Sequence, residues 1–222
     1  MNDIIQYTFN RPRVVLPVIH VVDLKQAARN VQIARDEGAD GVFLISHTYE
    51  NEELLRIVRV LRVSSPRFFL GLNLLSVGSM HAYEDAFNAG ANGLWVDNPG
   101  LINLKNQGLL YFGGVAFKTQ PHVADECLAG HVQRASEIMD VVCTSGPSTG
   151  VPEDARRLRI MSEALVGRAP LAVASGVTPH NVREHLDAGV QAILVATGVS
   201  KNFHELDPAL LADLVKQVHQ WQ

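Results

Sequence analysis

The sequence has only two cysteines, Cys127 and Cys143, and no CxxC motif. This argues against a disulfide framework or a zinc knuckle, so both residues are expected to be reduced thiols that fill small spaces. The sequence also has no stretch rich in lysine or arginine, and its net charge is −4. That charge pattern gives no indication of nucleic-acid binding.

Long apolar runs are missing as well, and the N-terminal residues lack the pattern of a signal peptide. We therefore expect a cytoplasmic protein without membrane insertion. No GxGxxG motif follows the first apolar run, where His20-Val21-Val22-Asp23 stands instead. Dinucleotide binding thus loses its main sequence support. With 222 residues and 47% hydrophobic content, the chain is expected to form one domain over residues 1–222.

Short apolar runs alternate with segments of helical periodicity along the chain. Their β-branched and aromatic content is typical of strands buried on both faces of a parallel sheet. Eight such runs predict an α/β protein with an eight-stranded (β/α)₈ TIM barrel; a doubly wound open sheet is the alternative. The runs are Val14–His20, Gly41–Ile45, Phe68–Asn73, Gly93–Val96, Leu109–Val115, Asp140–Cys143, Leu171–Ala174 and Ala192–Val195.

A weak internal repeat supports this architecture. Gly38, Gly90 and Gly189 each stand where a predicted helix closes and a strand is about to begin. Glycine just past a helix end adopts the left-handed conformation that stops the helix. Three copies of one helix-to-strand turn indicate repeated βα units, which close naturally into a barrel.

Barrel active sites lie at the carboxyl ends of the strands, so polar residues there are the candidates for chemistry. His20 is predicted to be a general acid or base, with a hydrogen bond to the backbone as its structural alternative. Asp97 is predicted to abstract protons, or else to cap a short helix beginning near Pro99. Lys118 is expected to stabilise negative charge, with a Schiff base as the alternative role.

Hydroxyl and amide groups at other strand ends are the predicted substrate contacts. Ser145 lacks the glycine of a G-x-S-x-G nucleophile, so its loop is interpreted as a ligand-binding segment and a candidate lid. No histidine pair has metal-ligand spacing, although Mg²⁺ accompanying a substrate phosphate would find oxygen ligands in Asp97 and Asn73. The predicted substrate-binding residues are His47, Asn73, Thr144, Ser145, Gly146 and Thr149.

Two small-residue turns near the C-terminus indicate a phosphate site. Ser175-Gly176 and Thr197-Gly198 follow the last two predicted strands, the usual location for a phosphoryl group in a barrel. Glycine lets the backbone approach an anion, and a helix start supplies free N–H groups. Thr178 is the expected N-cap of that helix, with Pro179 at its first position.

These C-terminal motifs resemble the BtpA/SgcQ family, a ribulose-phosphate-binding type of barrel, and the chain is more distantly similar to phosphoribosylanthranilate isomerase. The residues that carry the likeness are 140–150, Arg156-Arg157-Leu158, 174–182 and 195–198, and more thinly Val18-Ile19-His20, 71–75 and Lys118. Departures lie on the proposed active face: Ser46-His47, Ser76-Val77 and Thr119 stand where the family has Glu-Asn, Asn-Asp and histidine.

The resemblance implies a phosphate-binding barrel but no particular reaction. From the residues together we expect an enzyme that acts on a sugar phosphate or phosphoribosyl compound by acid/base catalysis, as an isomerase, epimerase or lyase. Two alternatives remain: a non-catalytic assembly or regulatory factor that retains the phosphate pocket, and a Schiff-base aldolase using Lys118. A homo-oligomer is compatible with each of these functions.

Overall fold

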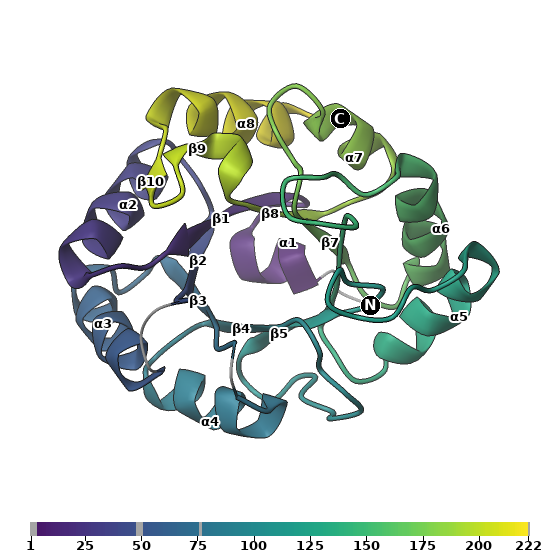
Figure 1. Ribbon diagram of the computed structural model, residues 1–222, viewed down its shortest axis with the longest axis horizontal. Helices are drawn as coiled ribbons and strands as arrows, with labels where there is room; N and C mark the ends of the chain where they lie inside the picture. Colours follow the sequence, from purple (N-terminus) through teal and green to yellow (C-terminus); the bar gives the residue numbers. More distant parts are fainter. Residues whose placement is uncertain (1–3, 48–50, 76, 222) are drawn as a thin grey trace.

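The computed structural model describes residues 4–47, 51–75 and 77–221. Eight parallel strands form a closed barrel in the order of the chain, and β1 pairs with β8 to complete the ring (Figure 1). The barrel prediction is confirmed and the open sheet is excluded. The strands are β1 Val14–His20, β2 Gly41–Ile45, β3 Phe69–Asn73, β4 Gly93–Val96, β5 Leu110–Gly114, β6 Val141–Ser145, β7 Leu171–Ala174 and β8 Ala192–Val195.

Most strand bounds match the prediction, but β6 begins one residue later and extends two residues further. Asp140 is not part of the strand because its carboxylate accepts backbone hydrogen bonds from Asn106 and Tyr111, at 3.0 and 2.9 Å. The acidic side chain therefore fastens the start of β6 to the segment before β5 instead of pointing into the barrel.

Helices surround the barrel, each burying one apolar stripe against the strands (Figure 1). In α2, for example, Ala27, Val31 and Ala34 are buried at helical spacing. The helices between strands and after β8 are α2 Leu24–Asp36, α3 Asn51–Ser64, α4 Ser79–Asn88, α5 Asp125–Ala135, α6 Ala155–Leu165, α7 Val182–Asp187 and α8 Pro208–Gln220.

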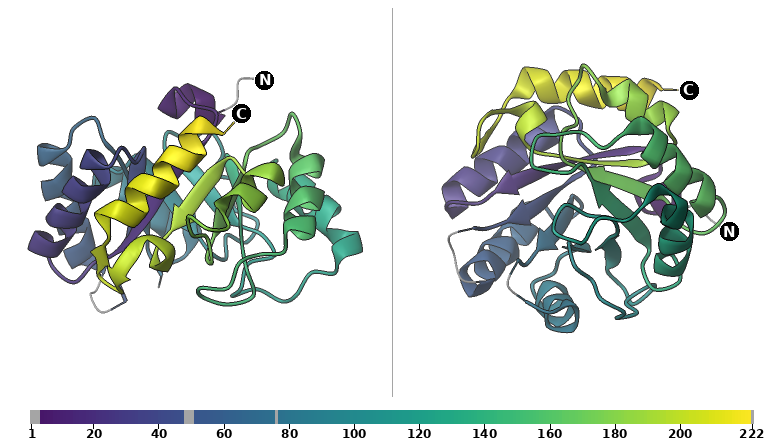
Figure 2. Two further views of the ribbon diagram at one scale, coloured as in Figure 1. Left: turned by 90° about the horizontal axis from the view of Figure 1, so that it is seen from above. Right: turned by 45° about the vertical axis from the view of Figure 1, so that its right-hand side comes forward.

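A second core fills the barrel itself, because alternate residues of each strand point inward. The inward set on β1 is Val14, Leu16 and Val18, and aromatic rings on β2 to β5 complete the filling. Helix α1, Ile4–Phe9, adds the fully buried Ile5 to this core. It lies at the end of the barrel away from the carboxyl ends of the strands (Figure 2).

The repeated turns have the predicted conformation. Gly38, Gly90 and Gly189 have φ values of 78°, 79° and 92°. By contrast, the helix predicted to start at Thr178 and Pro179 begins only at Val182, after Asn181. The Asn181 side chain accepts the Thr178 backbone N–H at 2.8 Å, so the four residues form a turn before the helix can start.

Between β8 and α8 the chain forms a short 3₁₀ helix, η1 (Thr197–Val199), and an antiparallel hairpin of β9 (Ser200–Asn202) and β10 (Glu205–Leu206). The hairpin and α1 lie at opposite ends of the molecule (Figure 2). Over the part of the chain that is described, no helix is both long and apolar enough to cross a membrane.

Candidate active site

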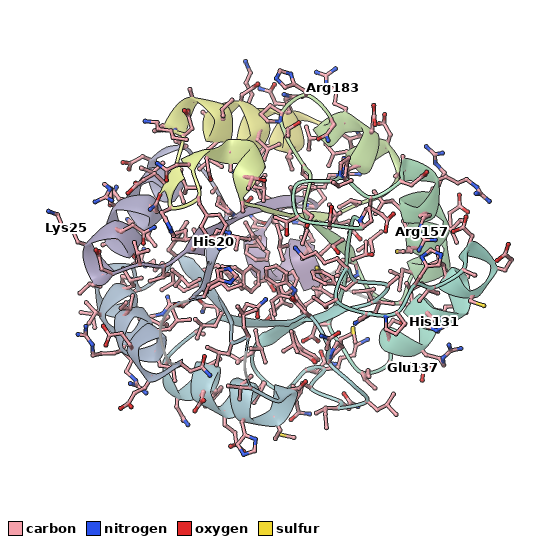
Figure 3. The ribbon with its side chains drawn as sticks, viewed as in Figure 1. His20, Lys25, His131, Glu137, Arg157 and Arg183 are labelled. Atoms are coloured by element: carbon pink, nitrogen blue, oxygen red, sulfur yellow. The ribbon has the colours of Figure 1, made fainter. Side chains whose placement is uncertain are left out.

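The inward alternation of the strands continues to their carboxyl ends and directs polar side chains into the barrel mouth. His20 shares the inward face of β1 with Val14, Leu16 and Val18. By the same alternation Asn73, Asp97 and Ser145 follow inward-pointing residues of β3, β4 and β6. Figure 3 shows His20 toward the middle of the ring, whereas Lys25 and Arg183 lie on the outer rim.

Asp97 directly follows β4 and is paired with Asn73 at the end of β3. The Asn73 Nδ2 donates to Asp97 Oδ1 over 3.1 Å, and Asn73 itself is only 2% exposed. Burial raises the pKa of Asp97, while the Asn73 hydrogen bond and the Lys118 charge partly oppose that rise. The carboxyl group is therefore a stronger base than an exposed aspartate. No helix lies between β4 and β5 among the described residues, so the alternative role of Asp97 as a helix cap is wrong.

The backbone of Asp97 is held by the segment after β5. Gly114 leaves room for the Asp97 carbonyl, since a Cβ at Gly114 would collide with it. The Gln120 amide donates to both Asp97 O and Gly114 O at 2.8 Å. Gln120, which the sequence patterns did not indicate, thus links the two loops that carry Asp97 and Lys118.

The His20 side chain bonds to another imidazole instead of to the backbone. Its Nδ1 lies 3.0 Å from Nε2 of His47, which follows β2. Burial, then the neighbouring His47, His204 and Lys118, lowers the pKa of His20 to about 4. At neutral pH His20 is therefore an uncharged imidazole that can accept a proton.

Lys118 connects three strand ends. Its backbone N–H donates to Ser145 Oγ at 2.9 Å, and its Nζ donates to Thr149 Oγ1 at 3.2 Å and to Ser175 Oγ at 3.3 Å. Its charge influences the pKa of both Asp97 and His20, so Lys118 interacts electrostatically with each of the other two predicted catalytic residues. An ammonium group flanked by two hydroxyls is a suitable contact for a phosphate or a developing oxyanion.

The two turns predicted to bind phosphate also lie at the mouth. Their glycines are explained by close packing of the backbone. A Cβ on Gly176 would collide with the backbone of Val151 and Pro152, and one on Gly198 would collide with the Val177 carbonyl. Close backbone packing on the Cβ side therefore requires glycine at both positions. Ser175, at φ 85°, and the exposed Thr197 present hydroxyl groups beside these turns.

Thr144 is the predicted contact that the fold directs away from the mouth. By strand alternation its side chain points in the same direction as that of Val142, toward the surrounding helices, and it is completely buried. Gly146 is also buried and packs against Val151 O, whereas His47 and Thr149 are exposed. Ser76, one of the departures from the family pattern, lies outside the described residues.

A cleft of about 710 Å³ adjoins the mouth and shares Lys118, Ser145 and Gly146 with it. Its outer wall includes Arg157 and the buried His185. Within residues 4–47, 51–75 and 77–221, no three His, Cys, Asp or Glu side chains are grouped so that they could hold a metal ion. Mg²⁺ delivered with a substrate phosphate, bound by Asp97 and Asn73, stays a prediction.

Sequence comparison finds no protein-family model and no curated protein that matches this chain. Solved structures with the same fold include thiamine phosphate pyrophosphorylase from Pyrococcus furiosus (17% identity, 94% of this chain and 97% of that one, TM-score 0.68). N-(5'-phosphoribosyl)anthranilate isomerase from Pyrococcus furiosus is 17% identical over 93% of this chain and 98% of its own (TM-score 0.66). 2-Keto-3-deoxy-6-phosphogluconate aldolase from Zymomonas mobilis is 15% identical over 100% of this chain and 98% of its own (TM-score 0.69).

At these identities the likeness shows the fold alone. The neighbours share the TIM-barrel fold with this chain, and their own names refer to phosphorylated compounds. They do not identify the BtpA/SgcQ family.

Proposed function

We propose that this protein is an enzyme that acts on a phosphorylated small molecule by acid/base catalysis, as a phosphosugar isomerase or epimerase or as a lyase. The observation that carries the proposal is the position of Lys118. Its charge acts on both Asp97 and His20 while its Nζ bonds Ser175 and Thr149. A base, a neutral imidazole and a cation thus share one barrel mouth.

In this mechanism Asp97 removes a proton from the carbon beside the carbonyl group of the open-chain substrate, and the electron pair moves to the carbonyl oxygen. Its raised pKa brings the carboxylate closer to the basicity that proton abstraction requires. His20, neutral at pH 7, donates or accepts the second proton at the substrate oxygen through Nε2, because Nδ1 faces His47. Lys118 stabilises the negative charge that develops on that oxygen.

The phosphate would lie at Ser175, Gly176, Thr197 and Gly198, with hydroxyl groups as the main side-chain contacts. The names of the structural neighbours support this substrate class, since each refers to a phosphorylated compound. We also infer a divergent relationship to the BtpA/SgcQ family, supported by residues 140–150 and 174–182.

Deuterium exchange tests the proposal even though the product is not identified. Ribose 5-phosphate, ribulose 5-phosphate and unphosphorylated ribose are incubated with the protein in D₂O, and loss of C–H signals is followed by NMR. We expect exchange only with phosphorylated compounds and its loss in Asp97→Asn. If no phosphorylated compound exchanges or turns over and the protein co-purifies with a stable partner, the non-catalytic alternative replaces the proposal.

A further inference from the structure

The hairpin after β8 brings an aromatic ring over the end of β1. Phe203 and His204 form its two-residue turn, and the Phe203 ring stacks on His20 with centroids 4.0 Å apart and an interplanar angle of 24°. His47 stacks on His20 at 5.1 Å and 23°. Phe203 and His47 also contact each other, with centroids 5.8 Å apart and an interplanar angle of 44°, so three rings from three separate segments form one aromatic cluster at the barrel mouth.

Two buried amides of α2 hold the hairpin turn in place. Gln26 and Asn30, 3% and 0% exposed, donate to the His204 carbonyl at 2.5 and 3.0 Å. Asn30 Oδ1 also accepts the Leu206 N–H at 2.8 Å. Because buried polar groups are costly unless paired, these bonds oppose any movement of the turn. The backbone of the turn that carries Phe203 is thus held in place by α2.

The Phe203 side chain is 47% exposed. The ring stacks on His20, and the exposed part of the side chain is apolar surface open to a ligand. The His20 ring beneath it is uncharged at neutral pH, because burial and the neighbouring His47, His204 and Lys118 lower its pKa to about 4. A rigid, uncharged aromatic surface is suited to stacking with another planar ring.

The ring surface belongs to the same segment as the candidate phosphate contacts. Thr197 lies six residues before Phe203, and the Val199 N–H and Ser200 Oγ both donate to Ala196 O, at 3.1 and 2.8 Å. The Asp207 N–H then donates to Val199 O at 2.8 Å. One internally bonded segment therefore presents a hydroxyl at one end and a phenyl ring at the other.

We propose that Phe203 binds a planar aromatic or heteroaromatic ring of the substrate by stacking, so that the substrate is a phosphorylated compound carrying such a ring. This inference rests on the proposed function for the phosphate end of the ligand. Base-on-aromatic stacking contributes enough to raise affinity about tenfold. The substrate ring would stack on Phe203, which itself stacks on His20, and the phosphate would contact Ser175 and Thr197.

Binding of three matched probes measures the two ends of the ligand separately. Adenosine 5'-monophosphate has ring and phosphate, ribose 5-phosphate lacks the ring, and adenosine lacks the phosphate; uridine 5'-monophosphate extends the test to a smaller ring. Affinities are measured by calorimetry on wild type, Phe203→Ala, Phe203→Tyr and Phe87→Ala. Phe87 on α4 is 56% exposed and serves as a matched control for removal of a surface phenyl group.

We expect the nucleotides to bind about tenfold more tightly than ribose 5-phosphate. Phe203→Ala should remove this difference and leave ribose 5-phosphate binding unchanged, whereas Phe203→Tyr and Phe87→Ala should retain it. Equal affinities for nucleotide and ribose 5-phosphate, or a difference that survives Phe203→Ala, would overturn the ring site and leave the proposed function intact. Adenosine binding as tightly as its monophosphate through Phe203 would support the ring site and remove the phosphate function. Failure of all the probes to bind would overturn both.

Discussion

Lys118 Nζ lies 3.3 Å from Ser175 Oγ, which joins the loops after β5 and β7 across the barrel mouth. The same ammonium group bonds Thr149 Oγ1 at 3.2 Å on the loop after β6. The two hydroxyl groups are neutral, so they do not compensate the positive charge of the ammonium group. This arrangement leads us to assign charge stabilisation to Lys118 and proton transfer to its neighbours.

Lys118→Met should lower turnover by about a hundredfold or more, because the charge developing in the transition state loses its cation. Lys118→Arg is the control that retains charge but changes geometry. Borohydride added to protein and substrate should leave the mass of the protein unchanged. A reduced adduct mapped to Lys118 would instead establish the Schiff-base aldolase mechanism.

Asp97→Asn should reduce turnover by about 10²–10⁴-fold, since the amide cannot abstract a proton. Affinity for ribose 5-phosphate should hardly change, because the variant keeps a side chain that can still pair with Asn73. Kinetics and calorimetry on the same preparation separate the two effects. A parallel loss of turnover and affinity would refute the role of Asp97 as a base.

The raised pKa of Asp97 also predicts a gain in stability for the same variant. A carboxyl group whose folded pKa is raised binds its proton more tightly in the folded state. Stability from this group is therefore complete below its unfolded pKa of about 3.9 and declines as pH rises through the folded value. Asp97→Asn should have a higher Tm than wild type at pH 7 and no advantage at pH 3. An unchanged or lower Tm at pH 7 would contradict the burial argument.

His20 has the opposite pH signature. Its folded pKa of about 4 lies below the unfolded 6.5, so the unfolded state binds the proton first as pH falls. The stability that His20 supplies is present above pH 6.5 and is lost between pH 6.5 and 4. Thermal scans across this range should show a smaller loss of Tm in His20→Gln than in wild type. The exposed His180→Gln is the control, and identical curves for His20→Gln and wild type would contradict a half-buried, neutral His20.

Gly176→Ala should destabilise the fold by about 2–4 kcal/mol, because the methyl group overlaps the backbone of Val151 and Pro152 in a strained conformation. Gly150→Ala is the matched control: the φ values are 70° and 80°, but open space surrounds Gly150. Gly150→Ala should lower the free energy of unfolding by about 1 kcal/mol, because only the backbone conformation is strained. Urea unfolding measures the free energy of unfolding of both variants. Equal losses would contradict a backbone collision at Gly176.

Periodicity and glycine placement were sufficient to predict the barrel. Eight apolar runs predicted the strands nearly residue by residue, and the glycines at 38, 90 and 189 adopt the left-handed turns expected of them. Local chemistry was less informative at Thr178, where the hydrogen bond from its N–H to Asn181 delays the helix. That bond depends on a turn geometry that spacing alone does not specify.

The candidate site was predictable to the extent that strand ends converge. Lys118 acts electrostatically on both His20 and Asp97, but Thr144 points toward the helices because successive residues of β6 point to opposite sides. Gln120 and Phe203 carried no sequence signal. Their positions depend on contacts with residues far along the chain, such as the bond from Gln26 to His204.

Calorimetric binding of ribose 5-phosphate, with ribose as the unphosphorylated control, is the decisive experiment for the phosphate site. Ser175→Ala and Thr197→Val remove the two hydroxyls without the backbone collisions that substitutions at Gly176 or Gly198 would cause. We expect wild type to bind ribose 5-phosphate and not ribose, and each variant to lose roughly five- to thirtyfold in affinity while retaining its Tm. Equal binding of the two sugars, or unchanged affinity in both variants, would contradict a phosphate site after β7 and β8.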